Sequence, residues 1–298
     1  MPTRKPQNKY RLADLASIGL TCAIALGLGA CTSGSWQQNS RYSQAQDTAP
    51  AQHIDVSSVK DAVPRPEPYS RYGNPPSYVV LGKRYHTLGS SDNYRERGIA
   101  SWYGTKFHGH RTSSGESYDM YKMSAAHKSL PLPTYARVTN LGNGKSVTVK
   151  INDRGPFHEN RLIDLSYAAA SRLDILGKGT GLVEIEAIDP LEYSTPASKP
   201  AIAASQPKVA RSSPAGDKRH DPALYLQLGA FQNRSNAERL QARLSKTVPG
   251  NLQITEFISH QQPVYRVRVG PLASVETVDE LTKILATQGI ESPRVVID

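Results

Sequence analysis

The stretch Y-A-R-V-T-N-L-G-N-G-K-S-V-T-V-K-I, from Tyr135 to Ile151, decides the fold of the central part of the chain. Apolar and polar side chains alternate in its first six residues and alternate again from Ser146 onward. This period of two is typical of strands with one buried face, and the Gly142-Asn143-Gly144 run between them is typical of a turn. The stretch therefore predicts a β-hairpin.

Further short elements flank this hairpin. Residues 182–188 (L-V-E-I-E-A-I) predict a closing strand with an apolar inner face, and a short helix is expected through Ala170 to Leu173. Either Asp164 or Ser166 could cap that helix, because both side chains accept hydrogen bonds from the free N–H groups of a first turn. Many short strands with one short helix in fewer than a hundred residues predict a small barrel over about 98–190.

Length and composition place this barrel in a larger chain. A chain of 298 residues could hold about two domains, and its 38% hydrophobic content with 22 Gly and 21 Pro fits compact domains joined by unstructured segments. Residues 31–97 are rich in Gln, Ser, Pro and Tyr and predict a solvated tether, with possible docking near 78–85. Residues 191–220 predict a second linker.

The net charge of +10 would suit a nucleic-acid-binding protein only if it were concentrated on a folded face. Most of the excess instead lies in residues 1–30, 31–97 and 194–220, which are expected to be leader, tether and linker. The regions expected to fold are nearly neutral. We therefore expect no nucleic-acid partner.

The N-terminus has the form of a secretion signal. Four basic residues between positions 4 and 11 precede an apolar run from Leu15 to Ala30, which is too short and too rich in Gly and Ala for a membrane span. Residues 28–31, L-G-A-C, resemble the bacterial lipobox, so residues 1–30 would be removed and Cys31 would carry lipid. An ordinary signal peptide with an incidental cysteine is the alternative. In lipoproteins an Asp after the cysteine favours the inner membrane, so Thr32 favours the periplasmic face of the outer membrane.

Residues 221–298 predict a β-α-β-β-α-β order. Strand-like alternation at 224–228 is followed by apolar residues at helical spacing over 237–244. Two strands are expected at 252–254 and 264–269, a second helix at 278–285 and a last strand at 294–297. The leucines of the first strand should face the helices, which leaves the other face of the sheet open. This open face could be a plain solvated surface, or it could bind a ligand. That open face should carry aromatic, amide and guanidinium groups suited to a sugar: Tyr225, Gln227, Phe231, Arg266 and Arg268.

The region from Ala100 to Ser166 concentrates the remaining motifs. These are W-Y-G at 102–104, F-H-G-H-R-T-S-S-G-E at 107–116, A-A-H at 125–127, N-D-R-G-P at 152–156 and R-L-I-D-L-S at 161–166. They resemble the rare lipoprotein A family, whose barrel is a double-psi β-barrel. The motifs Q-L-G-A-F at 227–231 and Y-R-V-R-V-G-P at 265–271 resemble the SPOR domain.

The resemblance implies a function. The two families that the chain resembles suggest a mainly β barrel domain followed by an α+β SPOR domain, joined by disordered linkers. They imply a lytic transglycosylase that cuts peptidoglycan strands lacking stem peptides, leaves 1,6-anhydromuramyl ends and uses no cofactor. The SPOR domain implies binding to denuded glycan and enrichment at the division septum, where the division machinery is a possible partner. A non-catalytic, expansin-like glycan binder that loosens the wall is the alternative.

Cleavage of a glycosidic bond needs a carboxylic acid that protonates the leaving oxygen. The resemblance places Glu116, His127 and Asp153 on the family's functional positions. It places Asp164 where membrane-bound lytic transglycosylase A and expansins carry their key aspartate. Three of them also have a structural reading: Asp164 as a helix cap, Asp153 as a partner of Arg154 or Arg161, and His127 as a satisfied buried histidine. Glu116 has the least obvious structural role. The sequence does not rank Asp153 against Asp164 as donor.

Aromatic residues of the same region could pack against sugar rings, and core packing is their alternative role. The candidates are Trp102, Tyr103 and Tyr118. His108, His110, His127, Asp153 and His158 could furnish zinc ligands, but no H-E-x-x-H motif and no cysteine accompany them. We therefore expect no metal.

Overall fold

The computed structural model describes residues 43–52, 54–193, 222–259 and 261–298. The predicted signal peptide, the lipobox with Cys31 and the linker over 194–220 lie outside the described residues. Among the described residues, no helix is long and apolar enough to cross a membrane.

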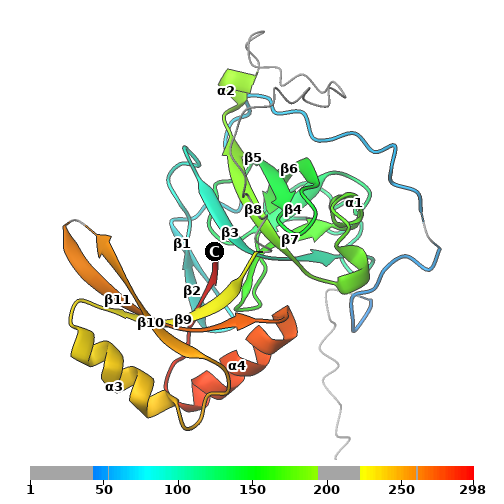
Figure 1. The fold of residues 1–298 in the computed structure, drawn as a ribbon. Helices are drawn as coiled ribbons and strands as arrows, with labels where there is room; N and C mark the ends of the chain where they lie inside the picture. The colour runs from blue at the N-terminus through cyan, green and yellow to red at the C-terminus, as the bar shows by residue number, and fades with distance from the viewer. Residues whose placement is uncertain (1–42, 53, 194–221, 260) are drawn as a thin grey trace, which may run out of the picture. The chain divides into compact units, whose positions relative to one another are not determined.

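Six strands close into a barrel in the order β3-β7-β4-β6-β5-β8, coloured cyan to green in Figure 1. β3 with β7 and β4 with β6 run parallel, and the other pairs are antiparallel. The predicted hairpin is β5 and β6, and the predicted closing strand is β8. The bounds are β3 (Arg95–Tyr103), β4 (Ser124–His127), β5 (Thr134–Asn140), β6 (Ser146–Asp153), β7 (Arg161–Ser166) and β8 (Gly181–Ile188).

The alternation of side chains explains why this barrel closes. Val138 of β5 and Val149 of β6 are fully buried, whereas Arg137 and Lys150 beside them face outward. The apolar positions of all six strands therefore meet in one interior. The short helix α1 (Tyr167–Arg172) follows β7, and the 3₁₀ helix η1 (Leu176–Lys178) leads into β8. The short helix α2 (Pro190–Tyr193) follows β8.

Residues 43–97 pack against the barrel over much of their length, which differs from the solvated tether expected from composition. Val56 is buried in the core, and the Asp61 carboxylate accepts a hydrogen bond from the backbone N–H of Thr148 at 2.9 Å. β1 (Ser77–Val80) and β2 (Lys83–His86) form an antiparallel hairpin within this segment. Prolines exclude regular structure from most of the segment, but they do not prevent its side chains from bonding to the barrel.

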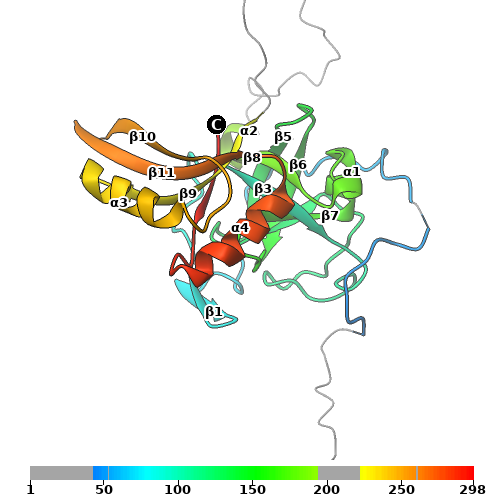
Figure 2. The ribbon, with the colours of Figure 1, turned by 60° about the horizontal axis from the view of Figure 1, so that its bottom comes forward.

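The C-terminal domain is a four-stranded sheet in the order β10-β11-β9-β12, and α3 and α4 lie on the same face of it (Figures 1 and 2). Leu226, Val267 and Leu285 are fully buried between sheet and helices. The predicted β-α-β-β-α-β order is confirmed. The bounds are β9 (Leu224–Phe231), α3 (Arg234–Leu244), β10 (Leu252–Ser259), β11 (Gln262–Leu272), α4 (Val275–Thr287) and β12 (Arg294–Ile297).

Candidate functional site

The two candidate aspartates lie in one row across the outer face of the barrel. Asp164 of β7 pairs with Ala126 of β4, and Ala126 pairs on its other side with Asp153 of β6. Asp164 lies between the fully buried Ile163 and Leu165, so its side chain points away from the barrel interior. Two strand spacings put the two aspartate backbones about 10 Å apart, with only the methyl group of Ala126 between them.

Asp164 is the candidate with the environment of a proton donor. Burial raises its pKa from 3.8 to about 6, against the opposing effects of a hydrogen bond from Ser101 and of the nearby Lys128 and Arg161 charges. The hydroxyl of Ser101, its neighbour on β3, donates to Asp164 Oδ1 at 2.5 Å. A carboxyl group with this pKa is partly protonated near neutral pH, as general acid catalysis requires.

The helix cap is Ser166 and not Asp164. Ser166 Oγ accepts a hydrogen bond from the N–H of Ala169 at 3.2 Å, which satisfies the first turn of α1. Asp164 is therefore not the helix cap, which was the structural role that the sequence allowed for it.

Gly155 leaves room beside the second oxygen of Asp164. A Cβ atom at Gly155 would lie 3.9 Å from Asp164 Oδ2 and 3.9 Å from the Ala126 methyl group. The φ of Gly155 is +138°, which L side chains rarely adopt. Among the described residues none hydrogen-bonds Oδ2, so this oxygen faces a space that the backbone keeps free of a side chain.

Asp153 holds a loop in place. Its Oδ1 accepts hydrogen bonds from the N–H of Ser113 at 2.7 Å, from the Ser113 hydroxyl at 2.6 Å and from the N–H of Arg154 at 2.8 Å. The Arg154 guanidinium instead binds carbonyl groups elsewhere, so the arginine partnership weighed from the sequence is made only through its backbone. Asp153 therefore positions the 111–117 loop next to the row of outer residues.

Glu116 belongs to an exposed ionic cluster on the other side of the same loop. Lys150 Nζ lies 2.8 Å from Glu116 Oε1, and the Asn152 amide donates to Oε2 at 2.7 Å. Burial acts to raise the pKa of Glu116, but the hydrogen bonds from Lys150 and Asn152 outweigh it and lower the pKa. Its side chain is 45% exposed. A carboxylate held ionised in this way is poorly suited to donate a proton.

We expect Glu116→Gln to retain activity within about threefold of the wild type. The amide loses the ion pair with Lys150, which at an exposed position is worth about 1 kcal/mol or less. The measurement is the rate of release of soluble product from denuded glycan, with circular dichroism as the control for folding. A hundredfold loss of activity in a folded variant would show that Glu116 takes part in catalysis.

His127 is a buried, neutral histidine. Its Nδ1 accepts hydrogen bonds from the N–H groups of Ser129 at 3.2 Å and Leu130 at 3.0 Å. Nε2 therefore carries the proton, and it lies 3.1 Å from the hydroxyl of Tyr94. Burial, with the nearby Arg154 and Lys128 charges, lowers the pKa of His127 to about 3. These contacts favour a positioning role for His127 at the end of β4.

The candidate aromatic residues are mostly covered. Tyr103 and Tyr118 stack with ring centroids 4.0 Å apart, and both are more than nine-tenths buried. Trp102 contacts Tyr167 edge to face at 6.0 Å and packs against the core. The outer-face residue of this strand that lies beside Asp164 is Ser101, which no sequence motif identifies.

No group of three or more metal-ligating side chains occurs among the residues that the structure describes. His108 Nδ1 accepts a hydrogen bond from the N–H of Met120 at 3.2 Å. Both ring nitrogens of His127 have the partners described above.

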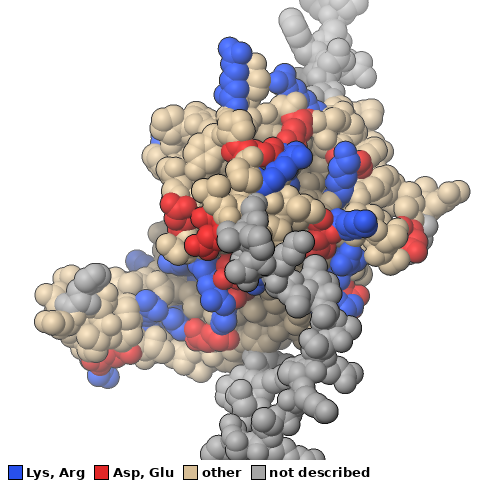
Figure 3. All heavy atoms as spheres, turned by 90° about the horizontal axis from the view of Figure 1, so that it is seen from above, with Lys and Arg blue, Asp and Glu red and all other residues tan. Residues whose placement is uncertain are grey.

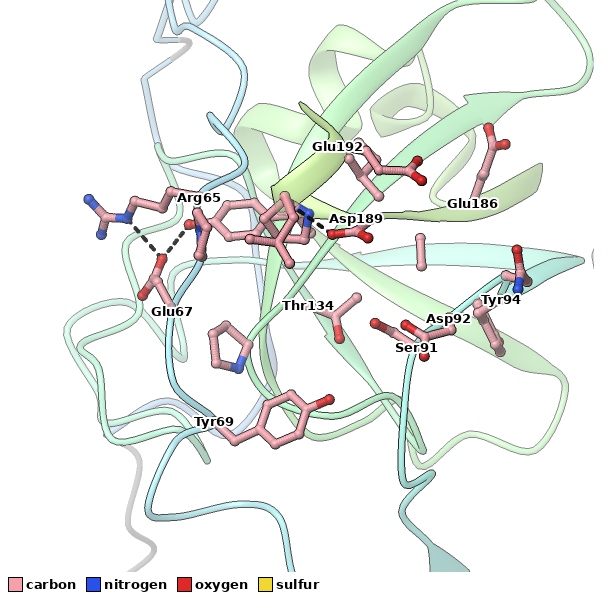
Figure 4. Close-up of a pocket in the computed structure, with 18 of the residues that line it drawn as sticks. Arg65, Glu67, Tyr69, Ser91, Asp92, Tyr94, Thr134, Glu186, Asp189 and Glu192 are labelled. Carbon is pink, nitrogen blue, oxygen red and sulfur yellow. Dashed lines mark hydrogen bonds and ion pairs between the residues drawn. The ribbon is translucent and has the colours of Figure 1, made fainter. Parts of the chain in front are cut away.

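A groove of about 1060 Å³ opens elsewhere on the barrel (Figure 4). It is lined by residues of the 65–69 segment, by Tyr94 and by acidic side chains at the end of β8, and Glu67 pairs there with Arg65 at 2.9 Å. None of the four candidate catalytic residues lines it. The candidate acid Asp164, whose burial and charge suit a proton donor, therefore lies outside this groove.

The open face of the C-terminal sheet carries a row of polar side chains across all four strands. Arg268 of β11 pairs with Gln253 of β10 and with Gln227 of β9, which pairs in turn with Arg294 of β12. Arg268 is only 8% exposed and bonds Asp298 at 2.9 Å, and its Nε has no hydrogen-bond partner among the described residues.

Phe231 does not lie on this open face, contrary to the expectation from simple alternation. A register shift between Val267 and Arg268 inserts an extra residue in β9, so Phe231 pairs with Tyr265 and packs on the helix side near Leu240. Tyr225 does lie on the open face, as expected, with its ring centroid 6.0 Å from the Arg268 guanidinium. A second aromatic group there is Phe257 of β10, which stacks under the Arg266 guanidinium at 3.5 Å. The period of two in β10 could have identified it.

On the face drawn in Figure 3, lysine and arginine side chains are interspersed with acidic ones. This view shows no continuous basic stripe of the kind that binds nucleic acid.

Comparison with known proteins agrees with this architecture. Residues 95–185 match the double-psi barrel family model described as "Lytic transglycolase", and residues 221–295 match that of the SPOR domain. An endolytic peptidoglycan transglycosylase RlpA of Pseudomonas aeruginosa is 40% identical over 99% of each chain. Its namesake from Vibrio cholerae is 39% identical over 91% of this chain and 92% of its own. A crystallised RlpA SPOR domain from P. aeruginosa shares 36% identity, covering 24% of this chain and 96% of that one, with a TM-score of 0.24. The near full-length identity, with both domain models in the same order, shows that the chain belongs to the rare lipoprotein A (RlpA) family.

Proposed function

We propose that the protein is an endolytic lytic transglycosylase that cleaves peptidoglycan glycan strands lacking stem peptides and leaves 1,6-anhydromuramyl ends. The observation that carries this proposal is the buried Asp164 carboxyl group, whose pKa is raised to about 6 and whose Oδ2 faces the space beside Gly155. The names of its full-length relatives agree with it.

In the proposed mechanism Asp164 acts first as acid and then as base. The protonated carboxyl group donates its proton to the glycosidic oxygen as the bond from C1 to that oxygen breaks. The 6-hydroxyl group of the same sugar then attacks C1 and returns its proton to the Asp164 carboxylate. The ring closes, no water is consumed and the side chain ends protonated, ready for another cycle.

The neighbouring groups have supporting roles in this proposal. Ser101 fixes Asp164 Oδ1 and so directs Oδ2 toward the substrate. Asp153 Oδ2 makes no hydrogen bond to a described residue and lies on the same face, so its charge can stabilise the positive charge that develops on the sugar.

The pH dependence follows from the raised pKa of Asp164. Because the donor must be protonated, kcat/KM should fall about tenfold per pH unit above the pKa near 6. The measurement is the initial rate on denuded glycan at low substrate concentration between pH 5 and 8. Glu116→Gln serves as the control, because it should leave this alkaline limb in place. A flat profile over that range would argue against Asp164 as the donor.

Mass spectrometry of digested denuded glycan tests the proposed function as a whole. A lytic transglycosylase leaves 1,6-anhydro ends, a hydrolase leaves reducing ends that have gained water, and an expansin-like binder leaves the strands intact. Only the first product supports the proposal.

We further propose that Cys31 is lipidated and holds the protein at the periplasmic face of the outer membrane, and that the SPOR domain enriches it at the septum. Cys31→Ser should then abolish incorporation of labelled palmitate and leave unprocessed precursor, visible as a slower band on a gel. Normal labelling of this variant would contradict the proposed lipid anchor.

Removing residues 221–298 should abolish septal enrichment while cleavage of soluble strands continues.

A further inference from the structure

We infer that Tyr85 and Phe157 form a sugar-binding subsite beside Asp164, which holds one ring of the glycan strand next to the bond that is cleaved. This inference rests on the proposed function, and it assigns a binding role to a segment that composition describes as a tether.

Three aromatic rings meet at this place, two from the β1–β2 hairpin and one from a distant loop of the barrel. Tyr78 of β1 and Tyr85 of β2 stack with centroids 5.4 Å apart, and Phe157 lies 5.5 Å from Tyr85 at an interplanar angle of 59°. Tyr85 and Phe157 are only half-buried, and none of the three rings packs against the hydrophobic core of the barrel. Core packing therefore does not explain them.

One of the rings, Phe157, lies beside the candidate acid, and Tyr85 continues the aromatic surface from it. The point that a Cβ of Gly155 would occupy is 3.9 Å from Phe157 Cε2 and 3.9 Å from Asp164 Oδ2. One methyl-sized gap thus separates the ring edge from the free oxygen of Asp164. A substrate whose glycosidic oxygen reaches Oδ2 must bring an adjoining sugar ring against this aromatic wall.

The hairpin that carries Tyr85 is fixed to the barrel in advance. The Tyr78 hydroxyl donates to the carbonyl of Lys128 at 2.6 Å, and the N–H of Leu88 donates to the carbonyl of Ser129 at 2.7 Å. Lys83 Nζ lies 3.2 Å from Glu159 Oε1, which ties the hairpin to the loop that carries Phe157. A wall held in this way needs little ordering when it binds a ligand.

A sugar ring suits this wall by its chemistry. Its axial C–H groups form an apolar face, and its hydroxyl groups point outward around the rim. Two rings tilted by 59° make an angled apolar surface for the C–H face and leave the rim in water. A flat, fully apolar ligand would gain no advantage from the polar groups at the edge of this surface, which include Lys83 and Glu159.

The test compares Tyr85→Ala and Phe157→Ala with the wild-type full-length chain on denuded glycan. Loss of roughly 50 Å² of apolar contact corresponds to about a tenfold weakening, so KM should rise about tenfold. Because the rings touch a sugar away from the reacting atoms, kcat should change by less than about threefold. Tyr85→Phe should restore the wild-type KM, because it keeps the ring and loses only the hydroxyl group.

Two further variants separate this idea from a structural effect. Leu81→Ala changes an 89% exposed residue at the tip of the same hairpin and should leave KM unchanged. Tyr72→Ala removes a 51% exposed tyrosine of the same segment and should also have no effect. An unchanged KM in folded Tyr85→Ala and Phe157→Ala, or an equal rise in Tyr85→Phe, would overturn the subsite. Such a result would not contradict the proposed function. The proposed function fails only if the wild-type protein forms no 1,6-anhydro ends.

Discussion

Asp164→Asn is expected to lower the formation of 1,6-anhydro product by a factor of about 10²–10⁴, the range typical of a lost general acid. The amide is nearly isosteric and can still accept the Ser101 hydrogen bond, but it has no proton of suitable acidity to give to the glycosidic oxygen. The measurement is single-turnover digestion of denuded glycan followed by mass spectrometry of the ends.

The same variant carries an internal control for folding. The pKa of Asp164 is raised in the folded protein from 3.8 to about 6, so its contribution to stability is complete below pH 4 and is lost as the pH rises through 6. The uncharged amide does not suffer this loss. Asp164→Asn should therefore unfold at an equal or higher temperature than the wild type at pH 7.5, although it is inactive. A folded variant that cleaves at the wild-type rate would exclude Asp164 as the acid.

Arg154→Ala is expected to destabilise the barrel by about 3 kcal/mol or more, because it leaves several buried acceptors without a donor. The Arg154 guanidinium donates to the carbonyls of Gly73 at 2.8 Å and Leu130 at 2.5 Å, and to Asn74 Oδ1 at 3.0 Å. Removing it weakens the attachment of the 70–74 segment, which keeps its hydrogen bonds to Leu132 and Ser114. The measurement is urea unfolding followed by circular dichroism.

Two other variants bracket that result. Arg84→Ala removes an exposed arginine of the hairpin and should change the stability by less than about 0.5 kcal/mol. Asn74→Ala removes the bonds to the backbone of Leu132 and Ser70 together with one of the Arg154 bonds, and it leaves the other Arg154 bonds in place. It should give an intermediate loss of stability, which remains measurable if Arg154→Ala fails to fold. A loss below 1 kcal/mol in Arg154→Ala would show that the guanidinium does not hold the segment in place.

The sequence predicted the barrel because its strands obey a simple rule. The alternation on either side of Gly144 and in residues 182–188 reflects one buried and one exposed face, and the structure has strands at both places. The helices of the C-terminal domain were predicted for the same reason, since their apolar residues recur at helical spacing. These features depend on neighbours in the sequence.

Features that depend on distant residues were not predictable in this way. The position of Phe231 is set by one extra residue in β9, which reverses every later side chain and leaves no mark in composition. The packing of residues 43–97 depends on single polar side chains, such as Asp47, that bond backbone atoms far along the chain. Ser101 became visible as the partner of Asp164 only when β3 and β7 were paired.

The contacts of the N-terminal segment also set a distance. The Gln44 side chain already bonds Thr105 of the barrel at 3.0 Å, and only thirteen residue steps separate it from Cys31. Even a fully extended chain of that length spans no more than about 45 Å. If lipid on Cys31 fixes one end in the membrane, the Gln44 attachment point stays within about 45 Å of the bilayer surface. The barrel can then cut only the layer of the wall that lies closest to the bilayer.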